Sequence, residues 1–180
     1  MIKFEVVSKY KDIDIDLIPK RKTSGSAGYD FTVAETCIIP PATNITHNLS
    51  NCLSSKDIVD FSDILKLTKE KKELRMTLVS TGVKCQLEKD TYLELSLRSS
   101  TPLKSWLIMG NSIGIIDSDY FNNPDNEGEI FFELINLTSK PIRLNKGDVI
   151  GQGIIKKYLT VDDEIENNQE RKGGFGSTKN

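Results

Sequence analysis

The stretch MTLVSTGVKCQLEKDTYLELSL, residues 76–97, contains two runs of β-branched and apolar residues, separated by the polar connector Glu88–Asp90. Short runs of this composition predict β-strands, and the polar connector between them carries turn chemistry. The stretch therefore predicts extended chain on both sides of a turn, a pattern that recurs along the rest of the sequence.

Short runs of the same kind lie on both sides of this stretch. They are Ile2–Val7, Tyr29–Val33, Glu129–Leu137, Pro141–Leu144 and Val149–Leu159. Many short strands separated by turn residues predict an all-β sandwich or barrel. Because a chain of 180 residues can bury one ordinary core, we expect a single β-barrel domain over residues 1–160, followed by a tail at 161–180.

One segment, between Ser54 and Leu74, breaks the strand pattern. Its apolar residues recur at the spacing of one helix face: Ile58, Phe61, Ile64 and Leu65. Ser54 and Asp57 resemble a capping box at the start of such a helix. We expect one amphipathic helix within a helical insertion at about 48–75. It would pack its apolar face on the β body, the alternative being a helix that binds a partner protein.

Composition excludes several classes of partner. The formal net charge is −2 at pH 7, so there is no excess of Lys and Arg to neutralise a nucleic-acid backbone. Cys37, Cys52 and Cys85 are odd in number and far apart, which gives neither a disulfide framework nor a CxxC metal site. No apolar run reaches the ~20 residues that span a bilayer, and the N-terminus lacks a signal-peptide pattern. We expect a soluble, cytoplasmic protein that binds neither nucleic acid nor a membrane, with the nucleus as the alternative for a eukaryotic or viral protein.

The C-terminal tail ends on the glycine-rich segment Arg171–Thr178, which reads RKGGFGST. The polar residues before it bury too little apolar area to order the chain, so we expect a flexible arm. Gly174 and Gly176 would let backbone N–H groups approach an anion, and Ser177 adds a hydroxyl donor. Phe175 could stack on a flat ligand. The segment predicts a loop that closes over phosphate, and a plain flexible terminus is the alternative.

Arg98, Ser99 and Ser100 directly follow the strand-like run Tyr92–Leu97. A guanidinium and two hydroxyls at a strand end can grip phosphate oxygens. A surface arginine paired with a carboxylate is the alternative.

The segment Gly110–Tyr120 reads GNSIGIIDSDY. The amide of Asn111 offers both a donor and an acceptor, which is what the edge of a pyrimidine base requires. Asp117 follows two isoleucines, and at the mouth of an apolar hairpin it could orient and deprotonate a water. A plain Asp-x-Asp turn is the alternative.

Two shorter motifs complete the set. Ala27–Asp30 carries a carboxylate at the head of a strand, and Gly147–Gln152 opens a later strand. In this order the five motifs resemble those of the homotrimeric dUTPase family. The resemblance runs from Ala27 to Thr178, apart from the helical insertion.

The resemblance implies a distorted jelly-roll β-barrel that assembles as a homotrimer. Active sites would lie at subunit interfaces, with the C-terminal arm of one subunit closing the site of another. The implied reaction is the hydrolysis of dUTP to dUMP and pyrophosphate by Mg²⁺-assisted attack of water on the α-phosphorus. That reaction limits uracil in DNA and supplies dUMP.

The resemblance also assigns roles to residues. Asp117 would activate the water, Tyr120 would pack beneath the deoxyribose and exclude a 2′-hydroxyl, and Asp30 would act through water on Mg²⁺ held mainly by the triphosphate. Uracil would be read by Asn111 with the hairpin backbone at Gly114 and Ile116. The phosphates would be contacted by Arg98, Ser99, Ser100, Gln152 and Arg171. In the arm, Gly174, Phe175, Gly176 and Ser177 would contact substrate, with Phe175 stacked on the base.

The sequence departs from the family pattern at several positions. Ser100 stands where glycine is common, and an inserted stretch at 122–127 replaces the usual Arg-Gly after Tyr120. Arg171 stands one residue closer to Phe175 than is usual, which leaves Lys172 as an alternative phosphate clamp.

Two other functions compete with dUTP hydrolysis. The related dCTP deaminases share the fold and use Arg-Ser-Ser with a later glutamate, whose setting Glu133 resembles. Such an enzyme would attack C4 of cytosine without a metal. The absence of an arginine shortly after Ser100 and the glycine-rich arm favour the dUTPase. The third possibility is a nucleotide-binding regulatory partner protein, against which the intact Asp117 and Asn111 argue.

Overall fold

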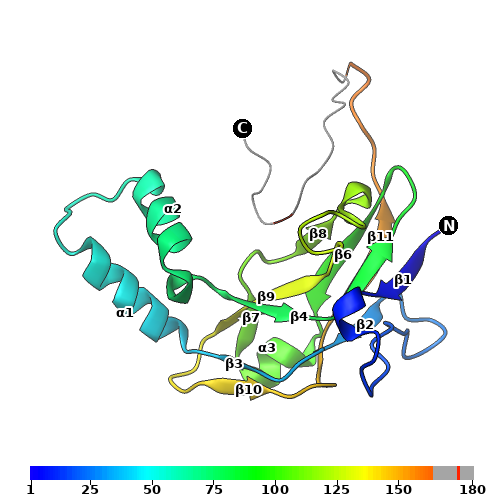
Figure 1. Ribbon diagram of the computed structural model, residues 1–180, viewed down its shortest axis with the longest axis horizontal. Coiled ribbons are helices and arrows are strands. Elements are labelled where there is room, and N and C mark those ends of the chain that lie inside the picture. Colours follow the sequence, from blue (N-terminus) through cyan, green and yellow to red (C-terminus); the bar gives the residue numbers. More distant parts are fainter. Residues whose placement is uncertain (164–173, 175–180) are drawn as a thin grey trace.

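A computed structural model describes residues 1–163 and 174 of the protein. Strands make up most of the body, and a pair of helices lies to one side of them (Figure 1). The strands are β1 (Lys3–Val6), β2 (Tyr29–Thr32), β3 (Cys37–Ile39), β4 (Thr77–Ser80), β5 (Val83–Gln86), β6 (Thr91–Leu97), β7 (Leu107–Met109), β8 (Gly114–Ile116), β9 (Phe131–Asn136), β10 (Ile142–Leu144) and β11 (Val149–Lys157). The helices are α1 (Ala42–Leu53), α2 (Phe61–Glu70) and α3 (Ser100–Ser105), with 3-10 turns η1 (Ser8–Tyr10), η2 (Lys72–Leu74) and η3 (Ser118–Tyr120).

The named strands pair antiparallel in four sheets. The largest has the order β2, β11, β6, β8, and the next has the order β4, β9, β7. β1 pairs with β5, and β10 pairs with β3. The all-β prediction of the jelly-roll type is confirmed, although the described strands form separate sheets and not one closed barrel.

Alternation along the strands builds the core. In β6, Leu93 and Leu95 are buried, and in β9 the buried residues include Phe132 and Leu134. Phe31 of β2 meets Phe132 with 5.8 Å between ring centroids. One face of β6 and one face of β9 therefore fill the interior, as alternation along a strand requires.

The predicted strands agree with the structure to different degrees. The run Thr91–Leu97 is β6 without any change in its ends. The run at 76–87 is broken into β4 and β5 at Gly82, which has φ +66°, and a Cβ there would lie 2.7 Å from Cδ1 of Leu17. Four of the described strands have three residues each, and of these only β10 falls in a predicted run, Pro141–Leu144, while β3, β7 and β8 do not show as separate periodic runs.

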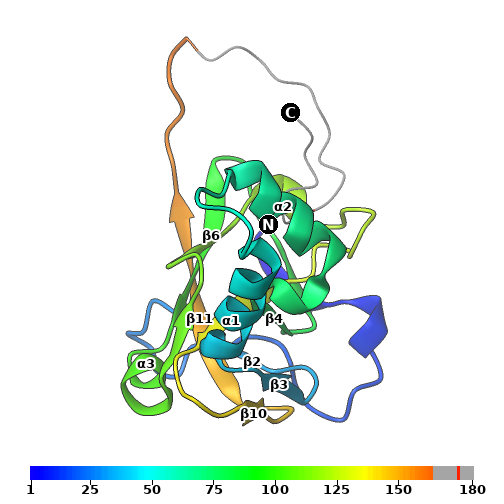
Figure 2. The same cartoon turned by 90° about the vertical axis from the view of Figure 1, so that its left-hand side faces the viewer.

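The helical insertion was predicted incorrectly in two respects. It holds two helices in place of one, and Ser54 does not start a helix, because its hydroxyl donates to the carbonyl of Asn51 at the end of α1. α2 begins only at Phe61, after Asp60. The two helices and η2 form an arm that projects from the strands, and we call residues 42–74 the helical arm (Figure 1 and Figure 2).

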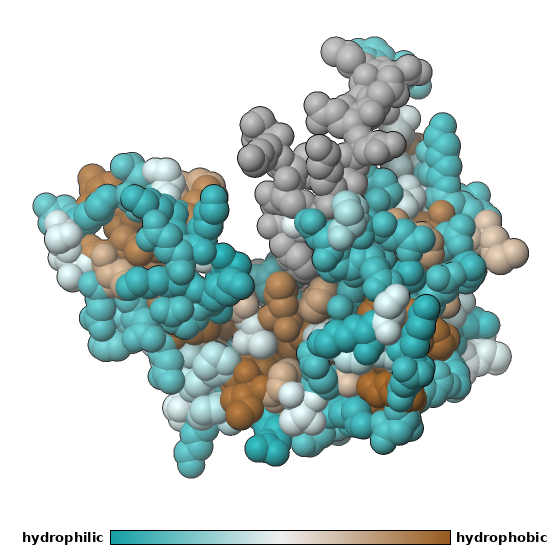
Figure 3. Space-filling view, in the orientation of Figure 1, coloured by the Kyte–Doolittle hydropathy of each residue, from teal (hydrophilic) through white to brown (hydrophobic). Residues whose placement is uncertain are grey.

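The apolar face of α2 does not pack on the β body, contrary to the prediction. No residue of α2 is buried, and Phe61 is 77% exposed. The half-buried side of the helix carries Ile64 and Leu67, and α2 contacts η2. Apolar side chains consequently remain visible among polar ones on the arm (Figure 3). No helix within the described residues is long and apolar enough to cross a membrane.

Candidate active site

Three predicted residues meet on the largest sheet. Gln152 of β11 lies in register between Asp30 of β2 and Ser96 of β6. Residues opposite one another in antiparallel strands share a face, and Arg98 lies two residues beyond Ser96, so it points to the same side. Nε of Arg98 lies 3.7 Å from Oδ2 of Asp30, and Nε2 of Gln152 lies 3.4 Å from Oγ of Ser96. We call Asp30, Arg98 and Gln152 the polar cluster.

Glycine makes room for this cluster. A Cβ on Gly28 would lie 2.4 Å from Oε1 of Gln152, so the Gln152 side chain occupies the space that a larger residue would fill. This close approach gives a physical reason for the glycine that precedes Asp30 by two residues in the motif Ala27–Asp30.

Asp30 has an incompletely bonded carboxylate. Its side chain is 11% exposed, and among the described residues Oδ2 has no hydrogen-bond donor, although Arg98 faces it. A buried carboxylate oxygen in this state can accept a hydrogen bond from a bound water or ligand.

The donor set suits a magnesium ion that is held mainly by substrate. The described residues contain no group of three His, Cys, Asp or Glu side chains that could hold a metal ion. Mg²⁺ commonly keeps several waters and binds through phosphates with one or two carboxylates. A single under-bonded carboxylate beside an arginine, Asp30 beside Arg98, fits contact through that water shell.

Ser99 and Ser100 lie where β6 gives way to α3. Ser99 is the residue before the helix and is exposed, and Ser100 is its first residue. The amide of Thr101 donates to the carbonyl of Arg98 at 2.9 Å, which turns the chain directly after the arginine. Both hydroxyls therefore directly follow Arg98 of the polar cluster in the chain.

The segment 107–116 runs between two sheets. β7 pairs with β9, and β8 pairs with β6, so the expected hairpin is not a pair of strands bonded to each other. Asn111 is exposed in the turn between them, where Ser112 has φ +63°. Gly114 packs against Leu95, while Ile116 lies opposite Leu93 and is half-buried. The turn can present an amide and apolar side chains to a flat base.

Asp117 precedes the turn η3, and Tyr120 is the last residue of that turn. Asp117 is exposed, and its carbonyl accepts a hydrogen bond from the amide of Tyr120 at 3.1 Å. Tyr120 is 5% exposed, and its hydroxyl lies 3.0 Å from the carbonyl of Glu129. Gly174 lies against the ring, since a Cβ there would come within 2.8 Å of Cε2 of Tyr120. The structure thus brings one glycine of the C-terminal motif to Tyr120.

The polar cluster and Asp117 are far apart within one chain. Ile116, the residue before Asp117, pairs with Leu93 near the start of β6. Arg98 lies five residues further along that strand, which at about 3.3 Å per residue is roughly 17 Å. A single chain therefore does not bring Asp117 to Arg98.

The remaining predicted residues fall into two groups. Arg171, Phe175, Gly176 and Ser177 lie outside the described residues. Glu133 is half-buried on β9, and its carboxylate lies beside Gly110, where a Cβ would be 2.8 Å from Oε1.

Sequence reasoning missed residues that surround Tyr120. Asn126 Nδ2 lies 2.7 Å from the Tyr120 hydroxyl, and Asn123 Nδ2 lies 2.9 Å from its carbonyl. Both belong to the inserted stretch at 122–127, to which the sequence assigned no role. The sequence signal that could have found them is the recurrence of Asn and Asp in NNPDN, residues 122–126, because these side chains commonly form hydrogen bonds with the nearby backbone in turns.

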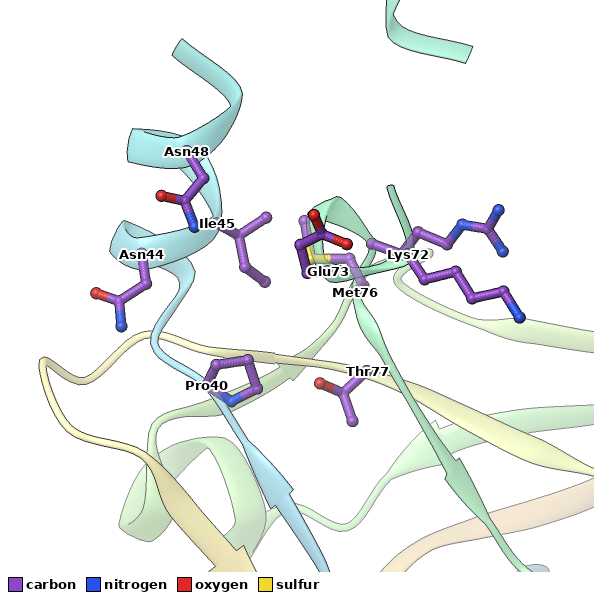
Figure 4. A pocket seen from close by; sticks show the side chains of 9 residues that line it. Pro40, Asn44, Ile45, Asn48, Lys72, Glu73, Met76 and Thr77 are labelled. Atoms are coloured by element: carbon purple, nitrogen blue, oxygen red, sulfur yellow. The ribbon is translucent and has the colours of Figure 1, made fainter. Parts of the chain in front are cut away.

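A pocket of about 420 Å³ lies at the base of the helical arm (Figure 4). Asn44, Ile45 and Asn48 of α1 line one side, and Glu73, Met76 and Thr77 lie across from them. None of the predicted site residues lines this pocket.

Comparisons with known proteins agree on one family. The dUTPase family model matches residues 66–179. The deoxyuridine 5′-triphosphate nucleotidohydrolase of Lactococcus lactis is 38% identical over 97% of this chain and 95% of its own length. The enzyme of the same name from Helicobacter pylori is 28% identical over 90% of this chain and 88% of its own.

Solved structures give the same result. A dUTPase from Streptococcus mutans has a TM-score of 0.67 and 34% identity, covering 89% of this chain and 98% of its own. A dUTPase from phage phi11 of S. aureus, whose structure concerns the coordination of a structural Mg(II) ion, has a TM-score of 0.58 and 15% identity, covering 93% of this chain and 98% of its own. At that identity the second match shows the fold alone.

Proposed function

Because the chain belongs to the dUTPase family, we propose that it cleaves dUTP by a magnesium-assisted attack of water on the α-phosphorus, at sites shared between three subunits. The activity itself, dUTP diphosphatase, yields dUMP and pyrophosphate. The proposal concerns the residues, the metal and the assembly.

The polar cluster is the observation that carries the proposal. A guanidinium, an amide and an under-bonded carboxylate converge from β6, β11 and β2. Arg98 and Gln152 bind phosphate oxygens, and Ser99 and Ser100 add hydroxyl donors as the chain turns into α3. Asp30 would hold Mg²⁺ indirectly, through water. Mg²⁺ on the triphosphate would neutralise the charge that builds as the α–β bond breaks.

Asp117 acts as the general base. Its carboxylate is exposed directly after β8, within reach of a water and of a nucleotide on the neighbouring turn. It orients that water and takes its proton during attack. Asn111 reads uracil together with backbone groups at Gly114 and Ile116.

Tyr120 forms the floor beneath the sugar. Its ring is buried and lies against Gly174 of the C-terminal motif, which supports closure of the arm over this part of the site. The contact lies within one chain, so closure by the arm of a neighbouring subunit stays a prediction.

The separation of about 17 Å along β6 between Leu93, which pairs with the residue before Asp117, and Arg98 supports the shared site. A nucleotide bound at Asn111 and Asp117 needs cations at its phosphates, and the polar cluster of the same chain is too distant to supply them. The cluster of a second subunit supplies them in a symmetric assembly.

The proposal is tested by product analysis. The protein is incubated with each deoxynucleoside triphosphate, with Mg²⁺ or with a chelator, and pyrophosphate and ammonia are measured separately. We expect dUTP to yield pyrophosphate with Mg²⁺ and not with the chelator. Ammonia from dCTP would instead show that the protein is a dCTP deaminase, with Glu133 as the glutamate that this reaction needs.

The role of Asp117 is tested by Asp117→Asn. The amide keeps the shape of the side chain but cannot take the proton, so we expect turnover to fall by at least about 100-fold while dUTP affinity measured by calorimetry changes little. Asp119→Asn, an exposed aspartate two residues along, is the matched control and should retain turnover. Loss of dUTP affinity in Asp117→Asn would assign Asp117 a structural role.

A further inference from the structure

The segment 121–128, which follows Tyr120, is closed by its own hydrogen bonds, and we call it the 121–128 loop. The amide of Asn122 donates to the carbonyl of Glu127 and the amide of Glu127 to that of Asn123, each at 3.0 Å. Asn122 and Glu127 both have positive φ, near +60°. Two non-glycine residues in this conformation indicate that the surrounding contacts determine the shape of the loop.

Asn123 organises the interior of the 121–128 loop. It is 4% exposed, and its Oδ1 accepts hydrogen bonds from the amides of Asp125 and Asn126 at 3.0 and 3.2 Å. Its Nδ2 donates to the carbonyl of Tyr120 at 2.9 Å. The loop is thereby tied to the residue that precedes it.

Asn126 fixes the hydroxyl of Tyr120. Its Oδ1 accepts from the amide of Gly128 at 3.0 Å and from Nδ2 of Asn123 at 2.8 Å. Because a backbone amide can only donate, this end of the side chain must be the oxygen. The Nδ2 therefore faces the Tyr120 hydroxyl, 2.7 Å away, and donates to it. The hydroxyl in turn donates to the carbonyl of Glu129.

The 121–128 loop is also anchored to the β body. Nζ of Lys84, on β5, donates to Oδ1 of Asn122 at 2.5 Å and lies 3.5 Å from Glu127. Glu127 accepts a hydrogen bond from the amide of Ser8 at 3.2 Å. Gly128 passes so close to Tyr120 that a Cβ would lie 2.5 Å from its carbonyl oxygen. The loop is thus braced from two sides and cannot yield as a free surface loop would.

We propose that Asn126 is a positioning residue that sets the discrimination between deoxyribonucleoside and ribonucleoside triphosphates. The inference rests on the proposed function, in which Tyr120 lies beneath the sugar. A ring excludes a 2′-hydroxyl only if it cannot retreat, because the added oxygen needs a small shift of the ring. Asn126 prevents that shift by holding the phenol oxygen at a point defined by the 121–128 loop.

The test compares Asn126→Asp with the unaltered chain. Aspartate keeps the size of the side chain and its acceptor oxygen, but it cannot donate to Tyr120. The hydroxyl has one proton, so it can donate either to the new carboxylate or to the carbonyl of Glu129, and one of the two hydrogen bonds that hold the phenol oxygen is lost. We expect the ratio of kcat/KM for dUTP to that for UTP to fall about ten-fold, mostly through faster UTP hydrolysis. The control is Asp125→Asn, because Asp125 is exposed in the same loop and its side chain should not affect the ratio.

A double-mutant cycle separates positioning from general loosening. Tyr120→Phe deletes the hydrogen bond with Asn126 together with the one to the carbonyl of Glu129, so adding Asn126→Asp to it should change the ratio no further. An additive loss in the double variant would overturn the inference, as would an unchanged ratio in Asn126→Asp. If Asn126→Asp does not fold, Tyr120→Phe alone decides, since an unchanged ratio there also overturns it. Failure of the unaltered protein to hydrolyse dUTP would refute the proposed function and not this inference alone.

Discussion

At the scale of single residues, Glu129 is a carboxylate that the fold buries beside the site. It is 8% exposed, and it accepts hydrogen bonds from the hydroxyl of Ser80 and from the amide of Gly82. Burial raises the pKa of Glu129 above its ordinary value of 4.5, because desolvation outweighs the hydrogen bonds from Ser80 and Gly82. The backbone carbonyl of Glu129 also accepts a hydrogen bond from the hydroxyl of Tyr120, which places this residue next to the site.

The raised pKa predicts a pH-dependent loss of stability. The folded state holds the Glu129 proton more tightly than the unfolded chain does, so the free energy of unfolding falls as the pH rises from the unfolded pKa through the folded one. Glu129→Gln keeps the acceptor oxygen and removes the titration. We expect the stability of the variant, relative to the unaltered chain, to rise as the pH rises above the ordinary value of 4.5, measured by urea denaturation. A difference that stays constant with pH would contradict this.

The residues of the site divide by how they could be found from sequence. Arg98, Asp117 and Gln152 stand in motifs whose order identifies the family, so the resemblance assigns them roles. Asn126 stands in a stretch without such a motif, and its contact with Tyr120 exists only because the chain closes on itself through Asn123. Short-range composition indicates a turn there, but it does not indicate which side chain the turn points at.

At the scale of elements, Lys84 ties the 121–128 loop to β5. Its side chain is 11% exposed and lies near two carboxylates, Glu127 at 3.5 Å and Glu5 at 3.9 Å. We expect Lys84→Met to lower the free energy of unfolding by about 1–3 kcal/mol, because it removes the cation beside Glu127 and the donor to Asn122. Lys3→Met is the matched control: Lys3 also pairs with Glu5 but is 46% exposed, and it should cost less than about 1 kcal/mol. Urea denaturation measures both, and equal losses would contradict the anchoring role.

The helical arm should be the least protected regular element. α2 buries no residue, whereas β6 and β11 pair over seven residues in the centre of a sheet. Local opening costs less where few apolar contacts are lost, so amide hydrogens of α2 should exchange at least about ten-fold faster than those of β6. Hydrogen exchange followed by mass spectrometry measures this. Equal protection would mean that another surface covers the arm in solution.

The helical arm also shows where sequence patterns fail. α1 reads ATNITHNLSNCL and is rich in Thr, Asn and Ser. These residues have a low helix propensity, so the composition of the segment did not predict a helix. α2 has a clear apolar spacing, and a helix there was predicted correctly, but its start was placed at Ser54. The strands were easier because each buries alternate residues, as Thr91–Leu97 does without a change in its ends.

At the scale of the whole molecule, the arrangement of the sheets separates the two halves of the proposed site. β6 carries Arg98 beyond one end and pairs with β8, and so with Asp117, near the other. The register of β6 with β8 sets this distance, and no spacing along the sequence contains that information. Trp106 and Leu137, linked by a backbone hydrogen bond of 3.1 Å, are also exposed, as residues at a subunit contact would be.

The separation predicts complementation between inactive subunits. In the proposed cyclic trimer each site would take Asp117 from one subunit and Arg98 from another. Asp117→Asn and Arg98→Ala should each be inactive alone, but refolding them together should restore activity. Random mixing in equal amounts pairs an intact Asp117 with an intact Arg98 in about a quarter of the sites, so about a quarter of full activity is expected.

A mixture of two variants from the same half is the control. Asp117→Asn with Asn111→Ala should recover nothing beyond the mean of the separate proteins, because both residues come from one subunit. Native mass spectrometry establishes that mixed trimers have formed. If they have formed and the first mixture stays inactive, each site is built from a single chain, and the distance along β6 must be closed by a movement within the subunit.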